Sequence, residues 1–247
     1  MIDVQPLGEV AVIRLDRPEK RNAQTPKMLA SLVGAIERAN SAKAIVLSGV
    51  GEVFCAGFDL TLCRDDNTVL EQLLTGLSRA VKAVRTAPCP VVVSAHGGAI
   101  AGGCALAAAG DLVITNADAK LGYPVLRLGI SPAVNAPVVR ASIGDGPART
   151  RLLEPRLIDG LQAHRIGLAH ECVPLLSNCE PRAIALAQEL AAKPRHALGY
   201  TKRWLNELDR TSDDAVLERS LRVSTALVGT EEQRQRLAEL WKATEKK

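Results

Sequence analysis

The chain has 247 residues, of which 47% are hydrophobic and only 2% aromatic, and its formal net charge is +4. This length fits one domain, or one domain with a small appendage, whose core must be built mainly from Ala, Val and Leu. Acidic residues lie among the 31 basic ones, so no stripe of positive charge predicts nucleic-acid binding.

Other broad classes are excluded by what the sequence lacks. No run of 18 apolar residues predicts a membrane span, and residues 1–6 do not begin a signal peptide, so we expect a cytoplasmic protein. The six cysteines form no C-x-x-C pair, and no histidine stands at metal-finger spacing, so we expect no metal site. The apolar or small-residue surroundings of four cysteines predict buried reduced thiols: Cys55, Cys89, Cys104 and Cys172.

The first part of the chain alternates strands and helices. Residues 10–15 predict a strand. Thr25 and Pro26 are typical of the cap and first position of a helix, whose apolar face would contain Leu29, Leu32, Val33 and Ile36. The unbroken apolar run 44–49 predicts a strand buried on both faces.

The pattern continues in the middle of the chain. Residues 69–86 predict a helix, 91–95 a buried strand, and a small-residue helix is expected to begin near Gly102. A further strand is expected at 111–115 and a helix within 160–167. Strands that alternate with helices indicate an α/β class with largely parallel pairing.

The last part of the chain reads as helical from Pro181 onward, with breaks at Pro194 and between Asp209 and Asp214. We therefore expect a core over residues 1–190 and a helical oligomerisation region over 191–247. Two apolar helix faces there would need a cover from another subunit: Val216, Leu217 and Leu221, and Leu237, Leu240 and Trp241.

Two glycine-containing stretches, residues 54–60 (FCAGFDL) and 101–104 (AGGC), carry the functional signal. In each, glycine beside a small residue allows a backbone N–H to turn outward with no side chain in the way. Two such N–H groups that converge on one point form an oxyanion hole, which stabilises negative charge on a thioester or ester oxygen. The alternative is that these glycines only permit tight turns and close packing.

These stretches and five others, in this order and spacing, resemble the enoyl-CoA hydratase/isomerase family, also called the crotonase superfamily. The further matching segments are 15–23, 110–112, 121–124, 128–132 and 166–173. The resemblance implies a spiral of β-β-α units with a helical C-terminal part, assembled as a homotrimer or a dimer of trimers. It also implies an acyl-CoA thioester as substrate and no separate cofactor, since CoA is part of the substrate.

The resemblance assigns the oxyanion hole to the backbone N–H groups of Phe58 and Gly102, the latter at a helix start where the helix dipole favours negative charge. The other positions implied to bind substrate are Arg17, Lys20, Arg21, Ala23, Ala56, Asp59, Leu60, Gly98, Ala101, Gly103, Ala105, Pro124, Val125 and Leu128. Cations at residues 17–21 would meet nucleotide phosphates, although a solvated charged turn is an equal alternative. Lys202 matches a family lysine that reaches the nucleotide, with a plain exposed helix lysine as its alternative.

The chain departs from the family pattern at the acid–base positions. Ala105 and Val125 stand where two catalytic glutamates usually stand, and Ala133 replaces an aspartate used by some relatives. None of these side chains can move a proton. His96, Tyr123 and Arg127 are the remaining candidates; the alternatives are a satisfied near-core histidine, a packing aromatic and a surface residue.

Hydration of an enoyl thioester is therefore disfavoured. Chemistry that needs mainly enolate stabilisation fits better, such as decarboxylation of a malonyl-type thioester or isomerisation with a non-standard base. The alternative from another class is a catalytically silent acyl-CoA-binding protein. The segment 63–66 is expected at the pocket rim, without an assigned role.

Overall fold

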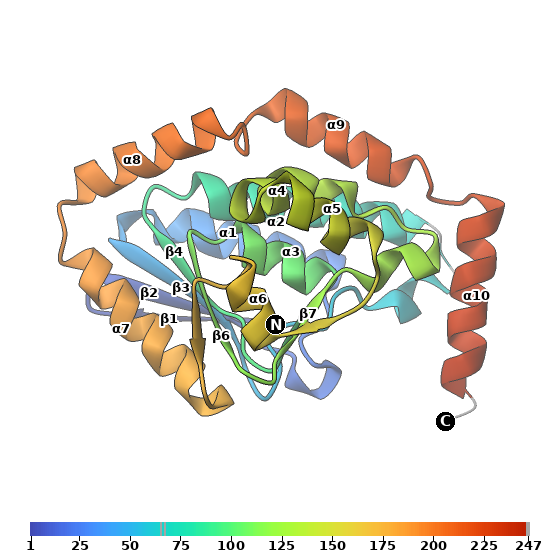
Figure 1. The fold of residues 1–247 in the computed structure, drawn as a ribbon, viewed down its shortest axis with the longest axis horizontal. Coiled ribbons are helices and arrows are strands. Elements are labelled where there is room, and N and C mark those ends of the chain that lie inside the picture. Colours follow the sequence, from blue (N-terminus) through green and yellow to red (C-terminus); the bar gives the residue numbers. More distant parts are fainter. Residues whose placement is uncertain (65, 67, 246–247) are drawn as a thin grey trace.

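The computed structural model describes residues 1–64, 66 and 68–245, with side chains to residue 243. Asp65, expected at the pocket rim, lies outside the described residues. A main sheet and a small sheet form the centre of the described chain (Figure 1). The main sheet has the order β1-β2-β3-β4-β6-β9, with bounds β1 Ile2–Leu7, β2 Val10–Leu15, β3 Ala44–Gly49, β4 Val91–Ser94, β6 Leu112–Asn116 and β9 Glu171–Val173.

Parallel pairing dominates the main sheet, as the alternation of strands and helices predicts. β2, β3, β4, β6 and β9 pair in parallel, and only β1 is antiparallel to its neighbour β2. Each residue of β3 is buried, as is each residue of β4, because helices cover both faces of the sheet. The expected α/β class is confirmed.

The small sheet positions the second glycine-containing stretch. It consists of β5 (Gly98–Ile100), β7 (Lys120–Gly122) and β8 (Ile158–Asp159), in the order β5-β7-β8. β5 also bridges to Cys55 through Ala99. A short strand that pairs on both sides thus carries the chain directly into residues 101–104. These three strands are too short to show a period-two pattern, and the sequence did not predict them.

Helices are packed on both faces of the main sheet and extend beyond it. Their bounds are α1 Pro26–Arg38, α2 Thr68–Thr86, α3 Gly102–Ala109, α4 Ala136–Ile143, α5 Asp145–Leu153, α6 Gly160–Arg165, α7 Cys179–Ala191, α8 Arg195–Leu208, α9 Asp214–Thr225 and α10 Glu231–Glu245. Thr25 caps α1 by accepting from the Met28 N–H at 3.1 Å, and Pro26 takes the first helical position, as expected. The sequence did not predict α4 and α5.

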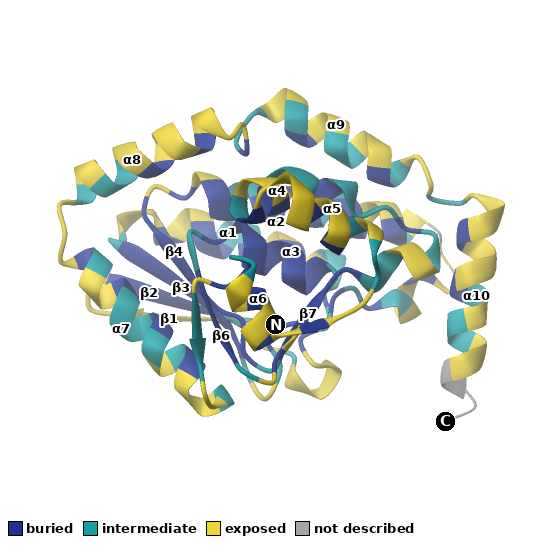
Figure 2. Cartoon of the chain, in the orientation of Figure 1, coloured by how far each residue is buried: buried dark blue, intermediate teal, exposed yellow. Residues whose placement is uncertain are grey.

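The core has two parts, one on each side of the sheet. The larger contains the inner faces of α1, α2 and α3 packed on the sheet. The smaller lies between the other face and α7, whose small residues Ala183, Ala187 and Ala191 recur every four positions and permit close packing. Figure 2 shows β2, β3, β4, β6 and α3 largely in the buried colour, β9 as intermediate, and the outer sides of α8 and α10 as largely exposed.

The C-terminal helices are placed differently from the expectation. α8 and α9 arch over the helical layer and α10 descends beside it (Figure 1). Leu217 and Leu237 are buried, and Leu221, Leu240 and Trp241 pack against the large core of the same chain. The two apolar faces expected to need another subunit are therefore covered within this one. The division at residue 190 coincides with the end of α7 but stays a prediction.

Of the four thiols expected to be buried, Cys55, Cys89 and Cys104 are buried, whereas Cys172 is half-buried near the end of the main sheet. Burial raises the pKa of Cys55 to about 12 and that of Cys104 to about 11, so both are neutral thiols at pH 7. Within the described residues, no helix is long and apolar enough to cross a bilayer.

Candidate active site

The two glycine-containing stretches lie against each other, and the contacts explain their glycines. A Cβ atom on Gly57 would lie 2.9 Å from the Ile100 carbonyl oxygen and 3.7 Å from the Gly102 nitrogen. A Cβ atom on Gly102 would lie 3.1 Å from the Phe58 ring atom Cε1. A side chain on Gly103 would overlap the Cys55 carbonyl oxygen. The close approach of the two backbones therefore requires glycine at 57 and 103, whereas at 102 the side chains of Gln24 and Phe58 occupy the space of a Cβ atom.

The backbone N–H of Phe58 points away from its neighbouring strand. Gln24 and Phe58 form an isolated parallel bridge, in which the Gln24 N–H donates to Gly57 O at 2.7 Å and the Asp59 N–H donates to Gln24 O at 2.9 Å. These two bonds use the Gly57 carbonyl and the Asp59 N–H, which flank Phe58 in the chain. The N–H of Phe58 itself therefore points away from Gln24. Among the described residues, the Phe58 N–H has no hydrogen-bond acceptor.

The N–H of Gly102 also has no acceptor among residues 1–64, 66 and 68–245, for a different reason. Gly102 is the first residue of α3, and the first N–H groups of a helix have no partner within it. The preceding residue, Ala101, adopts φ 52° and ψ −113°, an unusual backbone conformation for a residue with a side chain. Hydrogen bonds hold it there: its N–H donates to Gly122 O at 2.8 Å, and its carbonyl accepts from the Ala105 N–H at 3.0 Å.

Arg17, expected to contact nucleotide phosphates, is instead engaged within the fold. Its Nη1 donates to Asp59 Oδ2 at 2.7 Å and to Ala23 O at 3.1 Å. Burial raises the pKa of Asp59, but hydrogen bonds from Thr61 and Arg17 outweigh this, so its pKa is lowered and it remains a carboxylate. Arg17 therefore fixes the position of Asp59, the residue directly after Phe58. Lys20 and Arg21 are exposed on the same loop.

Asn22 connects this loop to the first glycine-containing stretch. It is fully buried, accepts from the Arg17 N–H at 2.8 Å and donates to Val50 O and Val53 O at 3.0 and 2.8 Å. Arg21 and Asn22 both adopt left-handed backbone conformations, and the Ala56 N–H donates to Arg21 O at 3.0 Å. The predicted positions Ala23 and Ala56, both half-buried, are thus held beside Phe58 by this loop.

The positions of the missing glutamates lie in apolar surroundings. Ala105 is fully buried on α3, one turn after Gly102, and Val125 packs against the core from the short 3₁₀ helix Pro124–Leu128. The polar groups beside this region are the Cys104 thiol and the Tyr123 hydroxyl, which adjoin each other. Burial raises the pKa of Tyr123 well above its ordinary value, so it is a neutral phenol at pH 7, and the Cys104 thiol is the polar group beside its hydroxyl.

His96 is turned toward a different cavity. Its Nε2 lies 3.2 Å from Gly51 O and its Nδ1 3.3 Å from the Ser94 hydroxyl. With Arg14 and Glu180 it lines a cavity of about 380 Å³ on the α7 side of the molecule. Burial lowers the pKa of His96, partly offset by hydrogen bonds to Ser94 and Gly51. The structure therefore places His96 as the satisfied histidine of the alternative interpretation.

The C-terminal helix packs beside the site. Trp241 Nε1 donates to Leu60 O at 3.2 Å, and the Arg64 guanidinium lies 5.7 Å from the centre of the Trp241 ring. α10 also contacts the 3₁₀ helix that carries Pro124, Val125 and Leu128. Gly129, which follows this helix, is glycine because a Cβ there would lie 2.8 Å from Gln233 Cα.

Lys202 fits neither of its two expectations. It is 7% exposed, and its Nζ donates to Asp111 Oδ2 at 2.7 Å and to the carbonyls of Val84 and Cys89 at 3.1 and 3.0 Å. Burial lowers the pKa of Lys202, and Asp111 opposes this shift. It attaches α8 to the end of α2 and cannot point to a nucleotide in this arrangement.

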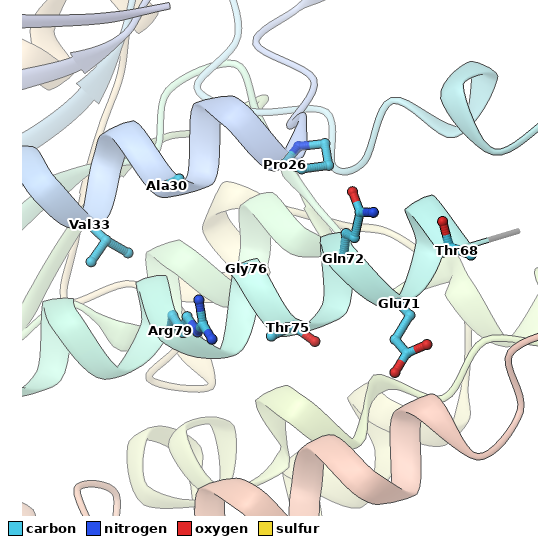
Figure 3. A pocket seen from close by; sticks show the side chains of 9 residues that line it. All are labelled: Pro26, Ala30, Val33, Thr68, Glu71, Gln72, Thr75, Gly76 and Arg79. Carbon is cyan, nitrogen blue, oxygen red and sulfur yellow. The ribbon is translucent and has the colours of Figure 1, made fainter. Parts of the chain in front are cut away.

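A cavity of about 590 Å³ lies apart from the predicted residues, between α1 and α2 (Figure 3). Ala30, Val33 and Gly76 form its apolar part, with Glu71 and Arg79 among the polar side chains around it. None of the sequence-predicted site residues lines it.

The comparisons with known proteins agree with the motifs. The family model described as enoyl-CoA hydratase/isomerase matches residues 7–244. The chain belongs to the enoyl-CoA hydratase/isomerase family. A short-chain-enoyl-CoA hydratase of Clostridium acetobutylicum is 30% identical over 206 residues, which cover 81% of this chain and 78% of the relative. A Thermus thermophilus relative that carries an enoyl-CoA hydratase name is 35% identical over 205 residues, 80% of this chain and 81% of the relative.

Solved structures show the same fold for this enoyl-CoA hydratase/isomerase family member. A Mycobacterium smegmatis enoyl-CoA hydratase superposes with a TM-score of 0.84 at 30% identity, covering 98% of this chain and 89% of that one. An enoyl-CoA hydratase/isomerase from Mycobacterium paratuberculosis gives a TM-score of 0.87 at 26% identity, covering 96% and 97%. The expected crotonase-like fold is therefore confirmed.

Proposed function

We propose that this family member binds an acyl-CoA thioester and polarises its carbonyl through the N–H groups of Phe58 and Gly102. The observation that carries the proposal is that two adjacent backbone segments each present an N–H that has no acceptor in the described part of the chain. Donors fixed in this way need no reorganisation when charge develops on the carbonyl oxygen. The start of α3 adds its dipole at the same point.

The reaction that fits best generates an enolate without the usual acid–base pair. In decarboxylation of a malonyl-type thioester, the C–C bond to the carboxylate breaks, CO₂ leaves, and the electron pair moves onto the thioester oxygen held by the two N–H groups. A proton from solvent then reaches the α-carbon. No carboxylate lies within three residues of Ala105 or Val125 in the sequence, so hydration lacks its ordinary proton-transfer groups. Isomerisation would require a base other than these positions.

The competing function is binding without turnover. It is favoured by the state of the nearby polar groups, because Cys104 and Tyr123 are both held neutral by burial. Neither is poised to exchange protons near pH 7. A protein of this kind retains the thioester site and its hydrogen bonds but performs no chemistry on the acyl group.

The remaining parts of the proposal concern the nucleotide end and the assembly. The exposed Lys20 and Arg21 are the cations of the loop that remain available for CoA phosphates, and we propose no cofactor beyond the CoA of the substrate. Oligomer formation would cover the exposed apolar side chains of α8, which are Tyr200, Trp204, Leu205 and Leu208, at 66, 59, 54 and 62% exposure.

The experiment is a panel of acyl-CoA thioesters, including malonyl-, crotonyl- and butyryl-CoA, measured for binding by calorimetry and for turnover by mass spectrometry. Binding with loss of CO₂ or double-bond migration supports the enzyme, and binding without turnover selects the silent protein. Absence of binding across the panel contradicts both. The N–H of Gly102 is tested with Gly102→Pro, which removes the donor at the first position of a helix, where no intrahelical hydrogen bond is lost.

Because a side chain on Gly102 would overlap Gln24, this variant is made together with Gln24→Ala, and Gln24→Ala alone is the matched control. We expect a folded double variant, judged by circular dichroism, to bind thioesters at least about tenfold more weakly than its control. Equal binding by the two variants would show that Gly102 is not part of the hole.

A further inference from the structure

The chain segments that lead into the two glycine-containing stretches run side by side and are joined by backbone hydrogen bonds. The Phe54 N–H donates to His96 O at 2.9 Å. The Cys55 N–H donates to Gly98 O at 3.1 Å, and Cys55 O accepts from the Ile100 N–H at 3.0 Å. Because the two proposed N–H donors follow a few residues beyond these bonds, the register of the two segments sets how far apart the donors lie.

The turns that precede these hydrogen bonds are in tight contact. Gly51 and Gly97 both adopt left-handed backbone conformations, with φ of 90° and 64°. A Cβ atom on Gly97 would overlap the Glu52 carbonyl oxygen, so glycine permits the approach. Glycine is also the residue with the greatest backbone freedom, and the two turns therefore need a further interaction to keep one conformation.

The side chain of His96 provides that interaction. Its Nε2 lies 3.2 Å from Gly51 O, to which no backbone N–H in the described part of the chain donates. Its Nδ1 lies 3.3 Å from both the hydroxyl and the carbonyl oxygen of Ser94, the last residue of β4. His96 is only 4% exposed, so water competes little for these contacts. The imidazole thus joins the end of β4 to the turn that follows β3.

The chemistry of the two partners assigns the proton of the neutral ring. Gly51 O can only accept, so a hydrogen bond to it requires the proton on Nε2, and Nδ1 then accepts from the Ser94 hydroxyl. Burial lowers the pKa of His96, while the contacts with Ser94 and Gly51 and the Glu180 carboxylate oppose this shift. The ring is therefore neutral at pH 7 and above, where it can make both hydrogen bonds at once.

Asn22 and His96 hold the turn after β3 from two directions. Asn22 donates to Val50 O and Val53 O and so joins the turn to the loop of residues 17–23. His96 joins the same turn to the segment that leads into the second glycine-containing stretch. Removal of the His96 donor should therefore leave the turn attached to the loop but free to move relative to the second stretch.

We propose that His96 is a positioning residue of the oxyanion hole, whose Nε2–H keeps the turn at Gly51 in register with the segment that leads to Gly102. The inference rests on the proposed function and deepens it, because it names a side chain that fixes the spacing of the two N–H donors. A displacement of about 1 Å in such a site can cost about 10²-fold in rate. His96 acts through the backbone and not on the thioester, because its side chain lines the cavity on the α7 side.

The test compares two substitutions of His96 that differ in one hydrogen bond. A glutamine amide can place its Nε2 donor near the position of the imidazole Nε2, so His96→Gln keeps a donor for Gly51 O. His96→Met has a similar length and no donor. His170→Met is the matched control, because it also removes a histidine hydrogen bond: His170 Nδ1 accepts from the Val113 N–H at 2.9 Å, and Val113 belongs to neither glycine-containing stretch.

The spectroscopic measurement reports carbonyl polarisation directly. Crotonyl-CoA labelled with ¹³C at the thioester carbonyl is bound to each protein, and the carbonyl stretch is recorded by infrared difference spectroscopy. Thermal unfolding of each protein is measured in parallel. We expect the wild type and His170→Met to shift the stretch to lower wavenumber, His96→Met to lose a clear part of that shift, and His96→Gln to recover it. If the protein has turnover, kcat of His96→Met should fall about 10- to 100-fold.

A second measurement uses the unaltered protein without ligand, and it remains available if His96→Met does not fold. The chain has four histidines, so labelling with ¹⁵N-histidine gives a simple spectrum, in which the His96 signals are identified by their loss in His96→Gln. At pH 8 the ring-nitrogen shifts should show the proton of His96 on Nε2. A proton on Nδ1 overturns the inference, because Gly51 O would then face a lone pair.

An unchanged carbonyl shift in His96→Met overturns the inference and leaves the proposed function standing. Equal losses in His96→Gln and His96→Met also overturn it, because the bond to Gly51 O would not be their cause. A loss in His170→Met as large as in His96→Met does the same, because it would reflect the stability of the fold. If the wild type binds no thioester, the inference and the proposed function fall together.

Discussion

Arg17 Nη1 donates a hydrogen bond of 2.7 Å to Asp59 Oδ2, across 42 positions of sequence. Because Asp59 directly follows Phe58, this ion pair fixes the segment that presents one of the two proposed N–H donors. Both side chains are largely buried, at 20 and 8% exposure. The family resemblance assigns Arg17 to phosphate contact, but this ion pair makes it a positioning residue of the proposed site.

The first prediction concerns this pair. Arg17→Met leaves Asp59 buried without its cation, so the free energy of unfolding should fall by about 1–3 kcal/mol, and thioester binding should weaken. Lys20→Met is the control for stability only, because Lys20 is exposed on the same loop but is itself proposed to contact the CoA phosphates. Chemical denaturation and calorimetry measure both. Equal stability of the two variants would contradict the assigned role.

The Arg17–Asp59 pair also predicts how the stability of the fold changes with pH. The pKa of Asp59 is lowered in the folded protein, so its contribution to stability is fully present above the unfolded pKa of about 3.9 and is lost as the pH falls through the lower folded value. We expect the wild type to lose more stability between pH 5 and pH 2 than Asp59→Asn does. Denaturation curves that remain parallel for the two proteins over this range would be inconsistent with the pairing.

The second buried pair predicts a larger effect on folding. Lys202 is bonded to Asp111 and to two backbone carbonyls, so Lys202→Met leaves these acceptors without their donor and should cost about 3–5 kcal/mol of stability. Lys193→Met is the surface control, because Lys193 is exposed. Denaturant unfolding measures the free energy of unfolding of both variants. A loss for Lys202→Met no greater than that of the control would show that the pair is dispensable.

We expect the subunit contacts on α8, and no longer on the apolar faces of α9 and α10 that the sequence suggested. Trp204→Glu together with Leu208→Glu should convert an oligomer built on threes into monomers, because both side chains are exposed in the single chain. Leu161→Glu, on the exposed side of α6, is the control with 48% exposure. Light scattering measures the mass of each protein. A wild type that is monomeric at micromolar concentration would refute the prediction.

The sequence predicted the elements that have strong periodicity or caps. β2 and β3 occupy the expected residues, and α2 and α3 begin within one residue of expectation. The small sheet of β5, β7 and β8 was missed because its strands have only two or three residues, and its pairing depends on contacts distant in sequence. Single-chain patterns also cannot tell an apolar face covered by the same subunit from one that needs another, as Leu217 and Leu237 illustrate.

The site shows a similar division. The glycines at 57, 102 and 103 were recognisable because close packing around them leaves no room for a side chain. The hydrogen-bond partners of the polar side chains could not be predicted. Arg17 and Lys202 are ordinary cations in the sequence, and only the fold brings Asp59 and Asp111 to them. The position of His96 beside Gly51 likewise depends on the turn that follows β4.

The acid–base positions provide a gain-of-function prediction. Ala105→Glu with Val125→Glu should raise the rate of crotonyl-CoA hydration above that of the wild type, since general acid–base groups contribute about 10²- to 10⁴-fold each. Ala105→Gln with Val125→Gln is the control of matched size. Because Ala105 is fully buried, the fold of both variants is verified by circular dichroism. Equal rates for the two double variants would show that the pocket is not hydratase-like.

The most direct test of the account is the hydration of crotonyl-CoA by the unaltered protein, followed as loss of enoyl-thioester absorbance at concentrations that calorimetry shows to be saturating. The account predicts a bound thioester that is hydrated at least about 10²-fold more slowly than by a family member with both glutamates, assayed side by side. Hydration at the rate of that reference enzyme would contradict it, because another residue would then supply the protons that Ala105 and Val125 cannot.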